Sequence, residues 1–245
     1  MPTIKTMGRL FLIPSPLGAD AQAASYLSCL PEEIRALRCF VVENAKTARQ
    51  VLRKAHLASG LQALELHELN EHTPESAIDA LLAPLLAGND VGLLSEAGCP
   101  AVADPGAQLV RRAHARGLRV VPLPGPSSIL LALMASGLEG QRFAFCGYVP
   151  QRSPEREAAI RALEERARTR NETQIFIEAP YRNDRLLEAL LATCGEGTLL
   201  CVAADLTLAT EWIQTHPIGH WRARERPALD GRPTTFLLLA LSGSR

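Results

Sequence analysis

The chain lacks an excess of charge of either sign. Its 245 residues hold 26 lysines and arginines against 26 aspartates and glutamates, so the formal net charge is zero. A chain without net charge creates no long-range field that would attract it to nucleic acid or to an anionic membrane. The charge balance therefore argues against RNA as a partner.

The arginines are nevertheless unevenly distributed, because one segment between residues 152 and 170 is rich in them. Glutamates are interleaved with these arginines, and opposite charges three or four residues apart stabilise a helix. We interpret the segment as a salt-bridged, solvent-facing helix in preference to a phosphate-binding face. The residues concerned are Arg152, Arg156, Arg161, Arg166, Arg168 and Arg170, with Glu155, Glu157, Glu164 and Glu165.

Paired cysteines and long apolar runs are also missing. The 6 cysteines include no C-x-x-C pair and do not cluster with histidine along the sequence. We therefore predict no bound metal, no disulfide framework and a reducing compartment. No run of about 18 apolar residues occurs, and the N-terminus lacks an apolar stretch of signal-peptide length. A cytoplasmic protein is the expectation.

What the sequence does contain is a regular alternation of short apolar runs and amphipathic stretches. This alternation is typical of parallel strands joined by helical crossovers. We predict an α/β fold of two domains with mainly parallel sheets, the first at residues 1–120 and the second at 121–245. The predicted strands are 10–14, 39–42, 91–94, 120–123, 174–177, 199–203 and 235–241.

Three loops rich in proline, glycine and small residues directly follow predicted strands, at 14–18, 95–106 and 122–128. Ligands of open α/β sheets bind beyond the carboxyl ends of strands, which is where these loops lie. The first loop reads P-S-P-L-G, without a G-x-G-x-x-G pattern or a P-loop lysine. This composition argues against a dinucleotide or Walker-type site, and the loop taken alone is a tight turn.

The other two loops offer more specific groups. In the second, small residues around Glu96 and Gly98 would let a ligand lie against the backbone, and Glu96 could accept hydrogen bonds from it. Asp104 in the same loop is expected mainly to cap the following helix. In the third loop, Ser127 or Ser128 could cap a helix, bind an anion at its N-terminus, or do both.

Together, these loops resemble the tetrapyrrole-methylase superfamily, and specifically its ribosomal RNA 2'-O-ribose methyltransferase branch. The most specific match is S-E-A-G-C-P followed by D-P-G, which is similar to the branch's S-D-A-G-T-P-x-x-S-D-P-G. The segment 42–49, V-E-N-A-K-T-A-R, is similar to the branch's A-E-D-T-R-x-T-R, and residues 69–72 fall in its H-E-H-N region. Further matches at 135–138, 147–150, 176–182 and 205–207 extend the resemblance over nearly the whole chain.

The resemblance implies two α/β domains with S-adenosylmethionine in the cleft between them, usually within a homodimer. It also implies a set of cofactor contacts that come mostly from backbone-rich loops. Carried onto matching positions, these contacts are Pro16, Leu17, Gly18, Glu96, Ala97, Gly98, Val102, Ser127, Ser128, Glu178 and Leu206.

The implied reaction is methyl transfer to a ribose 2'-hydroxyl of 16S ribosomal RNA. Two alternatives remain open, a methyltransferase of tetrapyrrole-like or other small molecules and a non-catalytic protein that binds S-adenosylmethionine. Against the first alternative, the N-terminal turn lacks the G-x-G-P-G-D pattern of the porphyrin and corrin enzymes.

A ribose hydroxyl needs a base, and Glu43 and His72 are the catalytic candidates because a carboxylate or imidazole can accept that proton. Each also has a structural interpretation, Glu43 as a strand-end salt bridge and His72 as a polar residue before a helix. The predicted substrate-binding residues depart from the branch's pattern, with asparagine for aspartate at 44, Ala-Lys for Thr-Arg at 45–46 and tyrosine for histidine at 181. These departures put the acceptor in more doubt than the methyl donor. The predicted set is Asn44, Lys46, Arg49, Tyr181 and Arg182.

Overall fold

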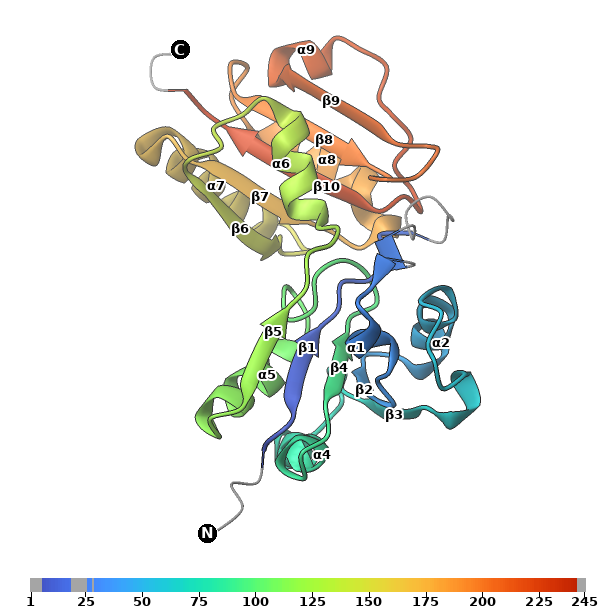
Figure 1. Ribbon diagram of the computed structural model, residues 1–245. Helices are drawn as coiled ribbons and strands as arrows, with labels where there is room; N and C mark the ends of the chain where they lie inside the picture. The colour runs from blue at the N-terminus through green and yellow to red at the C-terminus, as the bar shows by residue number, and fades with distance from the viewer. Residues whose placement is uncertain (1–5, 19–25, 28, 242–245) are drawn as a thin grey trace. The chain divides into compact units, whose positions relative to one another are not determined.

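The structure is a computed structural model that describes residues 6–18, 26–27 and 29–241. The chain divides into two compact units, residues 1–127 and 128–245. Each unit contains one five-stranded sheet (Figure 1). The sequence-based division at residue 120 falls inside strand β5 (Arg119–Pro122), which pairs with β1 (Arg9–Leu12) in the sheet of the first unit.

The sheet of the first unit has the strand order β3-β2-β4-β1-β5, and all of its pairings are parallel. Its remaining strands are β2 (Cys39–Val42), β3 (Glu65–Glu68) and β4 (Val91–Leu94). Every residue of β2 and β4 is buried. Continuous burial is what a parallel strand covered on both faces requires, and it explains why these strands read as unbroken apolar runs.

Helices cover both faces of this sheet. Because neighbouring residues of a strand face opposite sides, Phe40 joins one apolar core and Val41 joins the other. The first core also contains residues of α1 (Glu32–Arg35) and α2 (Ala45–Lys54). The second contains residues of the segment from α3 to α4 and of α5. The bounds of these other helices are η2 Leu61–Ala63, α3 Glu75–Ile78, η3 Asp79–Leu82, α4 Ala83–Leu86 and α5 Gly106–Ala115.

The sheet of the second unit has the order β6-β7-β10-β8-β9 and differs from the mainly parallel sheet that we expected. Only β6 and β7 pair in parallel, whereas β10 runs antiparallel to β7 and β8, and β9 runs antiparallel to β8. The residues between β8 and β9 are too few for a crossover helix, which normally needs a dozen or more, so these strands form a hairpin. The strands are β6 Phe143–Tyr148, β7 Thr173–Ile177, β8 Leu199–Ala204, β9 Trp212–Pro217 and β10 Thr234–Leu239.

The core of the second unit lies on the face of the sheet that carries α7 (Glu155–Arg170), α8 (Asn183–Thr193) and α9 (Ile218–Arg222). At its centre the rings of Phe176 and Phe236 stack with centroids 6.0 Å apart. Helix α6 (Ser128–Ser136) crosses the opposite face (Figure 1). The short helix η4 (Pro180–Arg182) leads into α8.

These observations confirm the α/β class. All seven predicted strands are present, as β1, β2, β4, β5, β7, β8 and β10, whereas β3, β6 and β9 had not been predicted. Within the described part of the chain, no helix has the length and apolar character needed to cross a membrane.

Candidate functional site

The first two of the three predicted loops are joined by backbone hydrogen bonds at the carboxyl end of the first sheet. They follow β1 and β4, which are neighbours in the sheet. The N–H of Ser15 donates to the carbonyl oxygen of Gly98 at 2.8 Å, and the N–H of Gly98 donates back to that of Ser15 at 2.9 Å. The hydroxyl of Ser15, which is fully buried, donates to the carbonyl oxygen of Ser95 at 2.7 Å. The two loops therefore form one fixed structure.

The third loop, which follows β5, packs against the other two. A Cβ atom at Gly125 would lie 2.5 Å from Cβ of Pro14, so only glycine allows this approach. A Cβ at Gly98, where φ is +71°, would lie 3.4 Å from Cδ2 of Leu17 and 3.7 Å from the carbonyl oxygen of Pro126. All three loops thus converge within the first unit, as a ligand site at this edge requires.

The second loop also contains strained backbone. Ala101 and Ala103 have φ of +66° and +59°, a region that costs residues with a Cβ roughly 1 to 3 kcal/mol each. Between them, Val102 is 46% exposed despite its apolar side chain. The carboxylate of Asp104 accepts hydrogen bonds from the N–H of Ala101 at 2.9 Å and of Gly106 at 2.6 Å. Asp104 therefore holds the strained turn as well as the start of α5.

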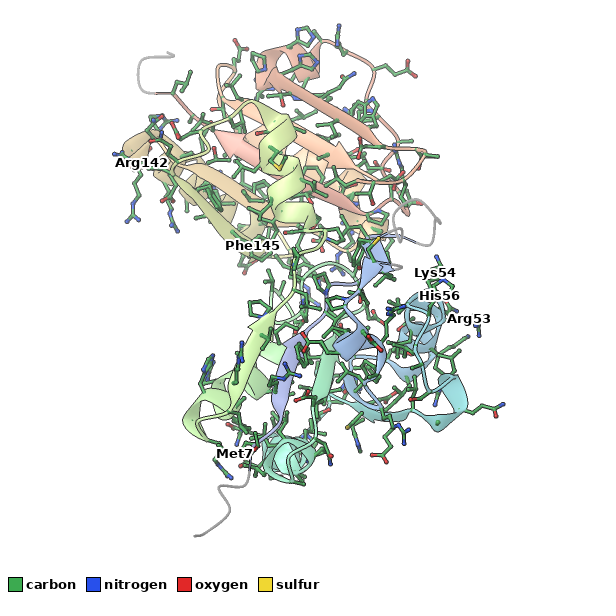
Figure 2. All side chains as sticks on the ribbon, in the orientation of Figure 1. Met7, Arg53, Lys54, His56, Arg142 and Phe145 are labelled. Atoms are coloured by element: carbon green, nitrogen blue, oxygen red, sulfur yellow. The ribbon has the colours of Figure 1, made fainter. Side chains whose placement is uncertain are left out.

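A pocket of about 460 Å³ opens beside the first two loops. It brings together five of the predicted cofactor residues and one face of α2. The face of α2 was not predicted, because its residues are mostly polar and no local pattern marks them as part of a site. Arg53 and Lys54 lie at the end of this helix (Figure 2). The lining residues are Pro16, Leu17, Gly18, Glu96 and Ala97, with Thr47, Gln50, Val51, Arg53 and Lys54.

Glu43 directly follows β2, the neighbour of β4, and its side chain reaches the second loop. Its Oε2 accepts a hydrogen bond from the backbone N–H of Glu96 at 3.3 Å. Burial raises the pKa of the Glu43 carboxyl, the nearby charges of Glu96, Asp104 and Glu71 raise it further, and the hydrogen bond opposes this in part. A half-buried carboxyl with a raised pKa beside these converging loops is suited to exchange a proton.

His72, the second catalytic candidate, lies on the surface after β3. Its side chain is 85% exposed, and its Nε2 is 3.6 Å from the carboxylate of Glu71. Its backbone N–H donates to Oδ1 of Asn70 at 3.0 Å. The structure therefore places Glu43 against the converging loops and His72 in solvent.

Asn44, the main departure from the branch's pattern, caps helix α2. Its Oδ1 accepts hydrogen bonds from the backbone N–H groups of Lys46 at 2.9 Å and Thr47 at 3.3 Å. Asparagine and aspartate are about equally good at this position, so the exchange preserves the cap. Lys46 and Arg49 are exposed on the first turns of the same helix.

In the second unit, Glu178 and Leu206 follow β7 and β8. The register of the intervening β10 pairs Thr235 with Ile177 and Thr234 with Ala204, so both residues lie at the same edge of the sheet. Leu206 is buried between Asp205 and Thr207, whose φ angles are +53° and +70°. The Oγ1 atom of Thr207 is buried and has no hydrogen-bond partner among the residues that the structure describes.

Glu178 is buried and anchors the predicted substrate residue Arg182. Its Oε1 accepts from Nη2 of Arg182 at 2.6 Å and from the N–H of Ala179 at 2.7 Å. The guanidinium of Arg182 lies 4.8 Å from the ring centroid of Tyr181, and its Nη1 donates to the Tyr181 hydroxyl at 2.7 Å. Tyr181 is 68% exposed, so one face of a fixed aromatic ring is open to solvent.

Comparison with known proteins agrees with this geometry. Residues 18–220 match the model of a family described as Tetrapyrrole (Corrin/Porphyrin) Methylases. The chain belongs to this family. It is 34% identical to ribosomal RNA small subunit methyltransferase I of Escherichia coli, over 87% of this chain and 71% of that protein. The protein of the same name from Vibrio cholerae is 30% identical, over 96% of this chain and 77% of its own length.

Among solved structures, the methyltransferase CobJ has a TM-score of 0.57 and 18% identity, covering 96% of this chain and 94% of that chain. This similarity establishes the tetrapyrrole-methylase fold. Family and relatives together establish a methyltransferase.

The capping role of Asn44 in this tetrapyrrole methylase can be tested by exchange of the side chain. Asn44→Ala should lower the free energy of unfolding by about 1 kcal/mol, because two backbone N–H groups lose their acceptor. Asn44→Asp should leave stability unchanged or raise it, since a carboxylate also favours the helix N-terminus. Denaturant unfolding measures both variants, with Lys46→Ala as the control on the same turn. Equal losses for alanine and aspartate would contradict the role.

Proposed function

We propose that this methyltransferase uses S-adenosylmethionine to methylate a ribose 2'-hydroxyl in 16S ribosomal RNA. The observation that carries the proposal is the convergence of three loops in the first unit beside a half-buried carboxyl, Glu43. The relatives support the acceptor, because their names specify the RNA of the small ribosomal subunit. The same resemblance supports a cytoplasmic homodimer.

The residues of the site fit S-adenosylmethionine. A pocket of about 460 Å³ lies within the usual size range of small-molecule sites, and its walls combine apolar side chains with backbone groups. Pro16, Leu17 and Ala97 would contact the adenosyl portion, and Glu96 offers a carboxylate to its hydroxyl or amino groups.

Bound S-adenosylmethionine supplies a methyl group that the positive sulfonium has already activated. The protein must hold the acceptor oxygen in line with that methyl group, and such positioning can contribute about 7 to 11 kcal/mol. The hydrogen bonds between Ser15 and Gly98 and the close packing at Gly125 fix the loops before any ligand binds. This rigidity reduces the entropy that binding would otherwise lose.

Glu43 is our choice for the base that accepts the proton of the ribose hydroxyl. One oxygen of its carboxylate accepts from the N–H of Glu96, and the other has no hydrogen-bond partner among the described residues. The side chain of His72 is 85% exposed and its imidazole approaches only the carboxylate of Glu71 among the described side chains, so we assign it to the surrounding surface. Lys46 and Arg49 follow Glu43 on the exposed start of α2, where they could contact RNA phosphates. In the second unit, the open ring of Tyr181 could stack on a base.

The acceptor is tested by mapping 2'-O-methylation in 16S ribosomal RNA from a strain that lacks the gene. One methylated ribose should be lost, and the wild-type gene should restore it. The Gly98→Leu gene should fail to restore it, because its product lacks the cofactor site. An unchanged map in the deletion strain would overturn the RNA acceptor and leave methyl transfer in place.

Binding of S-adenosylmethionine is tested at Gly98. Gly98→Leu should weaken binding at least about 10-fold by calorimetry, because the side chain would enter the space beside Leu17 and strain a backbone with φ of +71°. Gly60→Leu is the matched control, since φ there is +67° and no atom lies within 4 Å of the added Cβ. Equal affinities in wild type and Gly98→Leu would remove this loop from the site.

The role of Glu43 predicts a pH dependence of kcat. A base must be ionised to accept a proton, so activity should fall as the pH drops through the pKa of Glu43. Because burial raises that pKa, the fall should occur above the ordinary glutamate value of about 4.3.

Glu43→Gln should lower kcat about 100-fold or more. It should also abolish the fall in kcat at low pH, which is the acidic limb of the pH profile. It should leave cofactor affinity intact, because the amide oxygen can still accept from Glu96. His72→Gln should keep both kcat and the limb. If the limb persisted in Glu43→Gln, another residue would be the base.

A further inference from the structure

A second pocket, of about 500 Å³, lies entirely within the second unit and is rich in arginine. It is formed by the segment that precedes α7, the first turn of α7, and the connection from β7 into α8. Four arginines and one carboxylate line it, so its charge is strongly positive. The lining residues are Gln151, Arg152, Ser153, Arg156, Glu178, Arg182, Arg185 and Leu186.

The four arginines are only partly neutralised. Glu178 pairs with Arg182 at 2.6 Å, and Glu157 approaches Arg156 at 3.5 Å. Arg152 and Arg185 form no ion pair or side-chain hydrogen bond with any residue in the described ranges 6–18, 26–27 and 29–241. At least two positive charges therefore have no paired counter-charge in the part of the chain that the structure describes.

Arg156 contributes a second, independent sign that an acceptor belongs in the pocket. Its side chain is only 18% exposed, and its Nε is buried without a hydrogen-bond partner among the described residues. A buried donor without a partner is destabilising, and more so when it is charged. Like charges around one hollow also repel each other. An anion in the pocket would relieve both costs.

We propose that this pocket binds phosphate groups of the RNA strand that carries the acceptor ribose. The inference rests on the proposed function and names how the second unit holds that substrate. Guanidinium groups present planar pairs of donors that match phosphate oxygens. Arg182 connects the pocket to the exposed ring of Tyr181, so a phosphate and a stacked base of one strand could be held together.

The sequence led to one interpretation for all the arginines between residues 152 and 170, but the structure places them in two different environments. Arg166 and Arg168 on α7 pair with glutamates, with Arg166 to Glu172 at 2.7 Å and Arg168 to Glu165 at 2.6 Å. For these residues the salt-bridged interpretation is confirmed. Arg152 and Arg156 line the pocket, and of these two only Arg156 approaches a glutamate, Glu157, among the described residues. A chain with zero net charge can thereby present a local cationic surface to RNA.

The test is the salt dependence of binding to a fragment of 16S ribosomal RNA. Arg152→Ala with Arg185→Ala should reduce the slope of log affinity against log salt by about 1 to 2, because each lost phosphate contact removes about 0.7 to 0.9 from the slope. Affinity at moderate salt should fall about 10-fold or more. Arg161→Ala with Arg170→Ala is the matched control, since these exposed arginines of α7 lie outside the pocket. An unchanged slope in the first double variant would overturn the proposal.

A second measurement separates this proposal from the proposed function. Inorganic tripolyphosphate should bind the wild type in calorimetry and should not bind the Arg152→Ala, Arg185→Ala double variant. If tripolyphosphate binds but the RNA slope is unchanged in the variant, the pocket serves a small anion and the RNA proposal is wrong. If the deletion strain loses one 2'-O-methylation of 16S ribosomal RNA and the salt slope of the double variant is unchanged, the pocket proposal fails and the proposed function stands. If the salt slope of the double variant falls as expected but the methylation map of the deletion strain is unchanged, the proposed methyl acceptor is wrong and the pocket proposal stands.

Discussion

The pair of backbone hydrogen bonds between Ser15 and Gly98 is the constraint on which the site in the first unit depends. A parallel sheet ends in loops whose backbone groups have no partners of their own, and such loops normally vary in position. The bridge fixes two of them to each other directly beyond β1 and β4. Leu17 then falls beside Gly98, and the N–H of Glu96 reaches Glu43 from the neighbouring strand.

The two units contribute different chemistry because their sheets are built differently. The all-parallel first sheet places successive loops at one edge, and these loops provide backbone groups and the Glu43 carboxyl. In the second sheet, β10 enters between β7 and β8 and runs against both, which leaves the carboxyl ends of those two strands at one edge. That edge carries Glu178 and Leu206, and the adjoining helix starts supply arginines.

The sequence predicted the strands whose burial gives continuous apolar runs and missed those at sheet edges. Strands β3, β6 and β9 are edge strands with partly exposed residues. The sequences of β3 and β9 are mixed in polarity, whereas β6, F-A-F-C-G-Y, is mostly apolar and was missed despite its composition. The edge strand β5 was found because Val120 and Val121 are apolar. The loops of the site were predicted because proline and glycine mark them locally. The arginine pocket was missed, since Arg152 and Arg185 meet only through the fold and no local pattern joins them.

The substitution of asparagine for aspartate at position 44 can now be given a physical meaning. Either side chain caps α2, so the helix and the orientation of Glu43 before it do not depend on the choice. The charge at position 44, however, differs between asparagine and aspartate. A carboxylate at position 44 would add to the negative charges of Glu96, Asp104 and Glu71, which already raise the pKa of Glu43. Asparagine adds no charge at this position next to Glu43. The exchange thus keeps the helix cap and leaves out one negative charge next to Glu43, so this departure from the motif is compatible with Glu43 as the proposed base.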